Sequence, residues 1–330
     1  MVFKPTALRG LFLTGFLGLA SCAGAPRSAT LPGGYLGQEP PGVRPSLFAP
    51  GVVSTPDAVE LNGVFSPDGS EFFFTRMTKS SNGEQIFRMH RSLLDSNGMW
   101  STPEHVQVYP NDATSLAVDM AYSSDGDRLY FLGRHPHALS PQNPSSDIWV
   151  SERTEDGGWS LATPVPPPVW TEHSESYSSL TPDDTLQFSS RRPGGYGTSD
   201  LWRAARRDDG GFDEPVNMGP RVNSQRSEGD SCVAPDGSYI VFTSTRPGGP
   251  GNGDLYVSFR ESGSGEWSEP ALLGNGINSA NTDYCPMVTP DGRYLFFSRR
   301  VSDPPGSGWD GVVAGDVYWI DTRAIHALRR

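Results

Sequence analysis

The chain has 330 residues, with 38 glycines, 30 prolines and only 19% charged residues. This composition disfavours long amphipathic helices and coiled coils, and it favours many short strands joined by turns. A net charge of −12 argues against binding to nucleic acid or to acidic membranes by charge alone.

The N-terminal segment is predicted to lie outside the fold. A positively charged start precedes the apolar run 11–20, which is much shorter than the ~20 residues of a membrane-spanning helix and is typical of a signal peptide over residues 1–21. The Leu-Ala-Ser-Cys sequence ending at Cys22 resembles the lipobox of bacterial lipoproteins, in which the cysteine is acylated; the alternative is an ordinary signal peptide in which Cys22 is accidental. Ala23 at the next position resembles lipoproteins of the outer membrane. We expect a flexible tether at 22–44, rich in Gly, Pro and Ser, and a lipid-anchored protein of the bacterial envelope that faces the periplasm.

From residue 60 onward one pattern recurs five times. Each repeat contains a tight turn, usually Ser/Thr-Pro-Asp-Gly, in which Pro presets φ, Asp bonds its own backbone and Gly accepts a positive φ. The turn aspartates are Asp68, Asp125, Asp183, Asp236 and Asp291. A strand precedes the turn, two β-rich runs follow it, and the fourth element contains Pro, as an edge strand can. A period of about 50–60 residues built from four strands is typical of a β-propeller.

The fifth repeat lacks its edge strand, and the N-terminus supplies a candidate. Residues 45–54 align without a gap with 215–224 and 270–279, which hold the edge strands of repeats three and four. Pairing this segment with the last three strands would close the ring and cover two exposed sheet edges. We therefore predict an all-β, five-bladed β-propeller of four-stranded antiparallel blades over residues 45–321, followed by a tail at 322–330.

The repeat (S/T)-P-D-G-x-x-L-x-F-(S/T)-x-R…D-(L/I)-(W/Y) resembles the WD40-like (PD40) repeat of TolB-like proteins and of propellers attached to prolyl-oligopeptidase-type peptidases. The Pro-Gly-Gly sequences at 191–197 and 245–251 are typical of it. The peptidases carry a separate α/β-hydrolase domain, whereas this chain has no G-x-S-x-G nucleophile sequence. The resemblance implies a non-enzymatic scaffold that binds an envelope protein or a glycan, without cofactor or metal. The alternative is a polysaccharide-acting glycosidase or lyase, whose catalytic carboxylates would lie about 5–9.5 Å apart and not be bound by Arg.

The candidate binding face is the face onto which the longer loops emerge. Its candidates are acids at or near the start of first strands, together with loop residues: Glu60, Asp119, Glu175, Glu228, Asp283, His135, His137, His173 and Trp309. Histidines beside carboxylates form a feasible zinc or general-base set, although loop histidines are often merely exposed. Trp309 either stacks a sugar or peptide ring or covers the channel.

Recurrent Arg and Asp residues are predicted to stabilise the scaffold. The arginines end second strands and the aspartates begin third strands, giving the pairs Arg134/Asp147, Arg192/Asp200, Arg246/Asp254 and Arg300/Asp316. Because an unpaired buried charge is costly, we expect each pair to form an ion pair across its hairpin. The alternative is that the ring of carboxylates binds a cation or a basic peptide.

The remaining cysteines, Cys232 and Cys285, occupy first strands of adjacent repeats. Their positions predict side chains that do not face each other, and hence two buried thiols rather than a disulfide. We expect a monomer that meets the membrane only through its lipid anchor and binds no nucleic acid.

Overall fold

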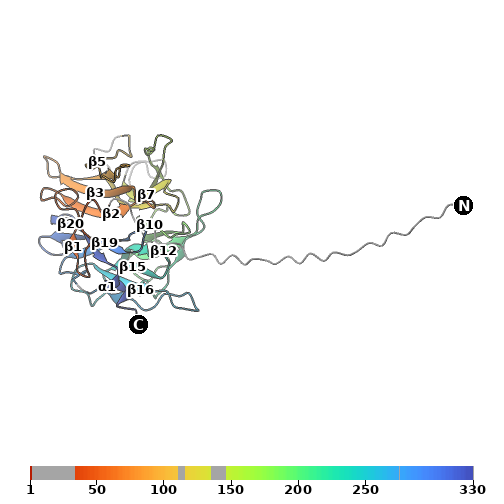
Figure 1. The fold of residues 1–330 in the computed structure, drawn as a ribbon. Helices are drawn as coiled ribbons and strands as arrows, with labels where there is room; N and C mark the ends of the chain where they lie inside the picture. Colours follow the sequence, from red (N-terminus) through yellow and green to blue (C-terminus); the bar gives the residue numbers. More distant parts are fainter. Residues whose placement is uncertain (2–33, 111–115, 135–145, 275, 330) are drawn as a thin grey trace.

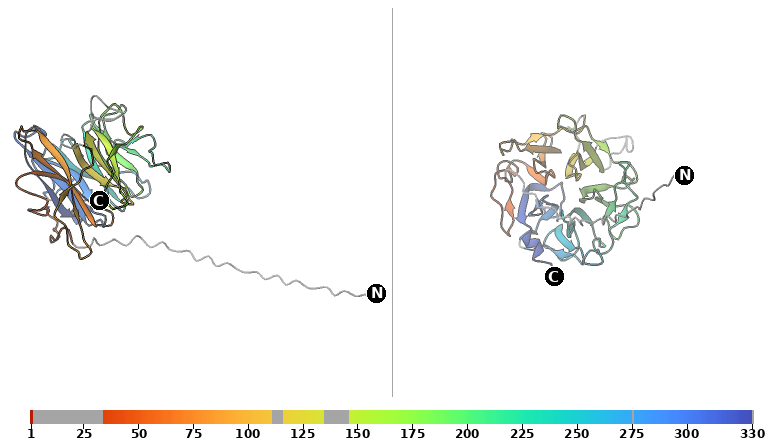
Figure 2. Two further views of the ribbon diagram at one scale, coloured as in Figure 1. Left: turned by 90° about the horizontal axis from the view of Figure 1, so that it is seen from above. Right: turned by 45° about the vertical axis from the view of Figure 1, so that its right-hand side comes forward.

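The computed structural model describes Met1 and residues 34–110, 116–134, 146–274 and 276–329. Five four-stranded antiparallel sheets are arranged in a ring (Figures 1 and 2). The first strands of the five blades line a central channel. Four blades follow the chain in order. Blade 1 holds β2 (Val59–Phe65), β3 (Glu71–Lys79), β4 (Gln85–Leu93) and β5 (Glu104–His105). Blade 2 holds β6 (Leu116–Tyr122), β7 (Arg128–Arg134), β8 (Asp147–Glu152) and β9 (Thr163–Pro164). Blade 3 holds β10 (Glu175–Leu180), β11 (Leu186–Ser190), β12 (Asp200–Ala204) and β13 (Val216–Asn217). Blade 4 holds β14 (Glu228–Val233), β15 (Tyr239–Ser244), β16 (Asp254–Phe259) and β17 (Ala271–Leu272).

Blade 5 is completed by the N-terminal segment, as predicted. It consists of β18 (Thr282–Val288), β19 (Tyr294–Ser302), β20 (Val312–Asp321) and β1 (Ser46–Leu47). In the antiparallel register, Ser46 lies opposite Trp319 and Leu47 opposite Tyr318. The five-bladed fold and its closure by mixed termini are therefore confirmed.

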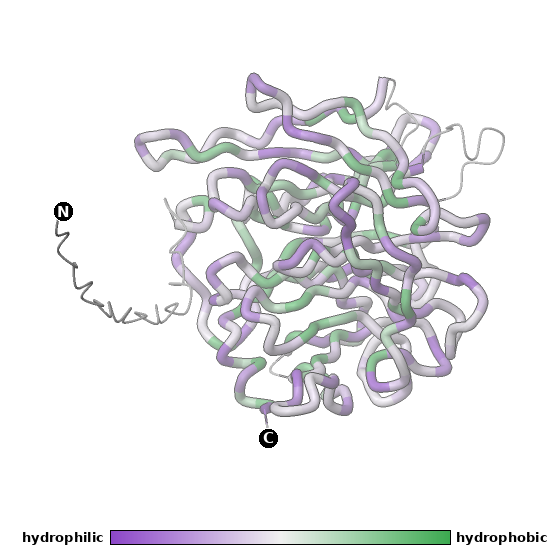
Figure 3. The backbone as a smooth tube through the Cα atoms, turned by 90° about the vertical axis from the view of Figure 1, so that its right-hand side faces the viewer, coloured by the Kyte–Doolittle hydropathy of each residue, from purple (hydrophilic) through white to green (hydrophobic). Residues whose placement is uncertain are grey.

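The apolar residues of the repeats form the interior. Figure 3 shows hydrophobic segments along the strands and hydrophilic segments in many of the connecting loops. At the closure, Phe48 is fully buried, and its ring centroid lies 4.7 Å from that of Phe296, 5.1 Å from that of Phe72 and 5.3 Å from that of Trp319. The last blade is thus tied to the first through its hydrophobic core as well as its backbone.

Part of the segment that we expected to be a tether packs against the propeller. Tyr35 is only 5% exposed, and its hydroxyl donates a hydrogen bond to the turn aspartate Asp291 at 2.8 Å. Its ring lies 4.8 Å from that of Tyr294. The C-terminal tail contains a short helix, α1 (Arg323–His326), which buries Ile325. Among the described residues, no helix is long and apolar enough to cross a membrane.

Candidate functional site

Each first strand contains an irregularity that turns one side chain toward the channel. The strand registers shift within the first strand of every blade. One residue of each shifted segment has a positive φ although it is not glycine: Asn62, Asp119, Tyr177, Asp230 and Cys285, with φ between 42° and 57°. We call these five residues the channel ring. Each stands six residues before its turn aspartate. Such bulges redirect side chains and are frequent next to active sites.

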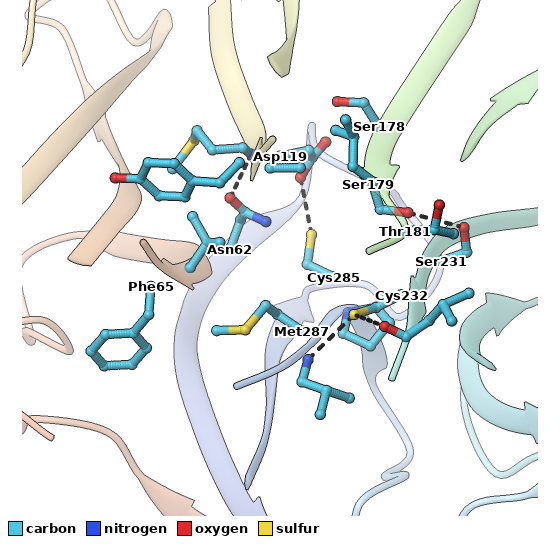
Figure 4. Close-up of a pocket in the computed structure, with 18 of the residues that line it drawn as sticks. Asn62, Phe65, Asp119, Ser178, Ser179, Thr181, Ser231, Cys232, Cys285 and Met287 are labelled. Atoms are coloured by element: carbon cyan, nitrogen blue, oxygen red, sulfur yellow. Dashed lines mark hydrogen bonds between the residues drawn. The ribbon is translucent and has the colours of Figure 1, made fainter. Parts of the chain in front are cut away.

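Three members of the channel ring meet. Asp119, Asp230 and Cys285 offer one oxygen or sulfur atom each, and these atoms lie within 4.8 Å of one another. The Cys285 thiol donates a hydrogen bond to Asp119 Oδ1 at 3.0 Å (Figure 4). Asp230 Oδ2 accepts hydrogen bonds from the Thr243 hydroxyl at 3.1 Å and from the Cys285 backbone N–H at 3.3 Å. Asp230 Oδ1 is buried and has no hydrogen-bond partner among the described residues.

Burial changes the protonation of this pair of carboxylates. Asp119 is 5% exposed and Asp230 is 8% exposed. Burial raises the pKa of Asp119 to about 6, opposed by the hydrogen bond from Cys285. Burial, followed by the charge of Asp119, raises the pKa of Asp230 well above its ordinary value. Because two neighbouring buried carboxylates resist joint ionisation, the pair retains a proton near neutral pH.

The channel ring separates two cavities. The loop-face cavity has a volume of about 620 Å³, and Asp119, Tyr177 and Asp230 are among its lining residues. The turn-face cavity, of about 340 Å³, opens among the turn prolines and is lined by all five members of the ring. Figure 4 labels three of them, Asn62, Asp119 and Cys285. A ligand in the loop-face cavity can therefore reach the two carboxylates.

Asp119, Asp230 and Cys285 also provide the kinds of donor atom that Zn²⁺ accepts. They form the one such group of three within the described part of the chain. Binding of Zn²⁺ would displace the thiol proton, which here lies in the hydrogen bond to Asp119. In the arrangement seen here, two neighbouring buried carboxylates, of which one keeps its proton, can act as an acid and a base.

The predicted pairing of the strand arginines is wrong in blades 3, 4 and 5. The ion pairs that form instead join an arginine near the end of the second strand to the acid at the start of the first: Arg76–Glu60 (2.9 Å), Arg192–Glu175 (3.3 Å), Arg246–Glu228 (3.2 Å) and Arg299–Asp283 (2.7 Å). The third-strand aspartates bind their own loops, since Asp200 accepts the N–H groups of Tyr196 and Gly197 and Asp254 that of Gly251. In blade 5 the burial of Asp316 is offset by a hydrogen bond from Ser54. The pair Arg134/Asp147 stays a prediction.

Four acids of the predicted binding face are structural. Glu60, Glu175, Glu228 and Asp283 are buried in these ion pairs. They also accept backbone N–H groups of the preceding loop, from Thr55 (3.1 Å), Thr171 (2.9 Å), Ser224 (2.7 Å) and Ser279 (2.7 Å), respectively. Their charges are thus used within the protein, and none is a free acid or base.

The remaining candidates, which are the tryptophan, the histidines and the lipidation cysteine, differ in where the structure places them. Trp309 lines the loop-face cavity together with Asp119. The backbone N–H of His173 bonds the Thr171 hydroxyl, and His173 does not line this cavity. His135, His137 and Cys22 lie outside the described residues.

Both remaining cysteines are free thiols, as predicted. Cys285 is buried, whereas Cys232 is partly exposed at the residue level. The sequence analysis did not assign Asp230 or Cys285 to the site. The sequence feature that could have identified them is their spacing from the turn aspartate, because both occupy the same position of the repeat as Asp119.

No protein-family model matches the chain, and no curated protein sequence matches it. The catalytic domain of a GH62 α-L-arabinofuranosidase from Coprinopsis cinerea is similar in structure, with 13% sequence identity, 85% of this chain and 97% of that chain covered, and a TM-score of 0.50. An α-L-arabinofuranosidase from Podospora anserina, solved with cellotriose, has 11% identity, coverages of 85% and 94%, and a TM-score of 0.47. A thermostable family-43 glycoside hydrolase has 13% identity, coverages of 84% and 91%, and a TM-score of 0.47. At 13% identity, the likeness to the Coprinopsis cinerea domain shows the fold alone.

These findings correct the family interpretation and what was inferred from it. The repeat did not identify a WD40-like, TolB-type family: no family model matches, and the Coprinopsis cinerea domain with this fold is an α-L-arabinofuranosidase. The expectation of a non-enzymatic scaffold rested on that resemblance and is overturned with it. The Coprinopsis cinerea domain shows a catalytic domain with this fold over nearly its whole length. Function must therefore be argued from the site.

Proposed function

We propose that this protein is a glycan-acting enzyme, a glycoside hydrolase, in which Asp119 and Asp230 are the catalytic carboxylates. One observation carries the proposal: two buried carboxylates from different blades meet at the loop-face cavity with oxygens within 4.8 Å of each other. Within the described part of the chain, neither is bound by Arg, in contrast to the four first-strand acids. The fold of the arabinofuranosidase domain supports the same class of reaction.

The environments of the two carboxylates suggest their roles. Asp230, whose pKa is raised the more strongly, holds the proton and acts as the general acid. Asp119 ionises more readily, with a pKa of about 6, and acts as the nucleophile. The separation of their oxygens is closer to the ~5–5.5 Å of retaining glycosidases than to the ~6.5–9.5 Å of inverting ones.

The reaction then takes two steps. Asp230 gives its proton to the leaving oxygen as the glycosidic bond breaks, and the Asp119 carboxylate bonds to the anomeric carbon. Water, deprotonated by Asp230, next attacks that carbon and releases Asp119. The net result is hydrolysis with retention of the anomeric configuration.

The test is hydrolysis of a panel of aryl glycosides and plant and bacterial polysaccharides by the purified protein. We expect turnover on at least one of them, and a loss of about 10²- to 10⁴-fold in kcat for Asp119→Asn and for Asp230→Asn. Asp236→Asn is the matched control, because it makes the same chemical change in the turn of the same blade as Asp230 and should leave the rate unchanged.

The anomer that is released first, followed by proton NMR, tests the assignment of roles. Retention supports Asp119 as the nucleophile, whereas inversion contradicts it. A wild-type protein that cleaves no glycan in the panel, or a fully active Asp230→Asn protein, would contradict the proposed function.

A further inference from the structure

Arg300 places a guanidinium without an anionic partner in the loop-face cavity. It lies in β19 and lines the cavity, and its neighbour Arg299 is the residue that binds Asp283. Arg300 forms no ion pair with any residue that the structure describes, and its buried Nε has no hydrogen-bond partner there. Arg300 is partly buried, and a partly buried guanidinium without an anion is a ready binding site for an anionic group of a ligand.

Two aromatic rings fix the position of this guanidinium. Its central carbon lies 4.5 Å from the ring centroid of Trp309 and 5.5 Å from that of Tyr284. Trp309 is in turn packed edge-on against Phe87, with a centroid distance of 5.1 Å. A stacked guanidinium keeps its planar fork oriented, and this fork matches the two oxygens of a carboxylate.

The guanidinium also lies close to the channel ring. Burial raises the pKa of Asp230, Tyr177 and Cys285, and the positive charge of Arg300 opposes this rise in all three. Arg191 lines the same cavity and has no ion pair among the described residues. Besides Asp119 and Asp230, the acids Glu228 and Asp310 line it, and Glu228 is bound by Arg246. In a chain of net charge −12, two arginines without an ion pair among the described residues thus line the same cavity as the two proposed catalytic carboxylates.

We infer that the loop-face cavity binds uronic acid units of acidic glycans, with Arg300 recognising the sugar carboxylate. A uronic acid carries this carboxylate on the sugar ring itself. Its binding to Arg300 would therefore place the glycosidic bond of the same sugar next to Asp119 and Asp230. The inference names the substrate class of the proposed hydrolase and rests on that function for the cleavage step, although not for binding.

Binding is tested by calorimetry on the Asp119→Asn protein, which keeps the cavity but does not turn over. The probes are oligogalacturonate, an oligosaccharide containing glucuronate, a neutral oligosaccharide of equal length and a sulfated one. We expect at least one uronate probe to bind about 10- to 100-fold more tightly than the neutral probe, as suits a charge-assisted hydrogen bond. Introducing Arg300→Met into the Asp119→Asn protein should abolish the difference in affinity between the uronate and neutral probes. Introducing Arg300→Lys instead should keep part of that difference. Arg203→Met, on the exposed side of β12, is the matched control and should change nothing.

The possible results separate the two proposals. Equal affinity for acidic and neutral probes, equal affinity for the sulfated probe, or an unaffected Arg300→Met protein would overturn the inference. Uronate binding through Arg300 without hydrolysis by the wild-type protein would support the inference and contradict the hydrolase. Hydrolysis of neutral glycans without uronate binding would support the hydrolase and overturn the inference. An unsaturated product would contradict hydrolysis, since elimination leaves a double bond, while leaving uronate recognition supported.

Discussion

Asp119→Asn should remove hydrolysis and, at pH 8, make the protein more stable. Folding raises the pKa of Asp119 from an ordinary value of 3.8 to about 6. A raised pKa in the folded state gives stability that is present below pH ~4 and is lost as the pH rises through about 6. At pH 8 the ionised carboxylate therefore destabilises the fold, by an amount on the order of 3 kcal/mol. Asn is neutral, has nearly the same shape, can accept the Cys285 hydrogen bond and tolerates the positive φ of 57°.

Urea unfolding at pH 4 and pH 8 measures this effect. The variant should gain about 1–3 kcal/mol over the wild type at pH 8 and nothing at pH 4. Asp236→Asn serves as the control, because the pKa of Asp236 is lowered on folding and the variant should lose stability at pH 8. A residue whose charge lowers stability is expected in a functional site rather than in a structural role. An Asp119→Asn protein that is less stable at pH 8 would show that Asp119 is structural.

Phe48→Ala should cost about 3–5 kcal/mol in the free energy of unfolding, as expected for a large side chain removed from a core. Phe48 is fully buried where the N-terminal segment closes the ring, and its backbone N–H bonds the carbonyl of Val317 at 2.9 Å. Losing its ring contacts would weaken both the last blade and its packing against the first. Urea unfolding monitored by tryptophan fluorescence measures the change.

Val52→Ala provides the control for this prediction. Val52 lies in the same segment but is 42% exposed, and its truncation should change stability by about 0.5 kcal/mol or less. If Phe48→Ala lowered the free energy of unfolding as little as Val52→Ala does, the closure of the propeller by its N-terminal strand would contribute little to stability.

The fold was predictable because it depends on local features that repeat. The turn aspartates and glycines reverse the chain regardless of the partner blade, and the alignment of residues 45–54 with two edge strands revealed the closure. The docking of Tyr35 was not predictable, since its partner Asp291 lies 256 residues away. The signal peptide, the lipidation of Cys22 and the envelope location stay predictions.

The site was only partly predictable because strand irregularities decide which side chains enter the channel. Regular alternation of side chains along a strand predicted that the acids at the start of the first strands, such as Glu228, lie near the channel mouth. The bulges instead turn in the residue two positions later, which is Asp230 in blade 4. The partner of each arginine depended on loop carbonyls as well, because Arg246 bonds both Glu228 and the carbonyl of Val222. Neither the bulge in the first strand nor the path of the loop before it could be predicted from the local sequence.

Carbon-13 NMR of the aspartate carboxyl groups between pH 4 and pH 9 tests most directly whether Asp119 and Asp230 are a coupled pair that keeps one proton near neutral pH. We predict one carboxyl signal that titrates near pH 6 and a second that is still protonated at neutral pH, with this behaviour lost in Asp119→Asn and in Asp230→Asn. If every aspartate of the wild-type protein is ionised by pH 5, the pair holds no proton for catalysis and the account is contradicted.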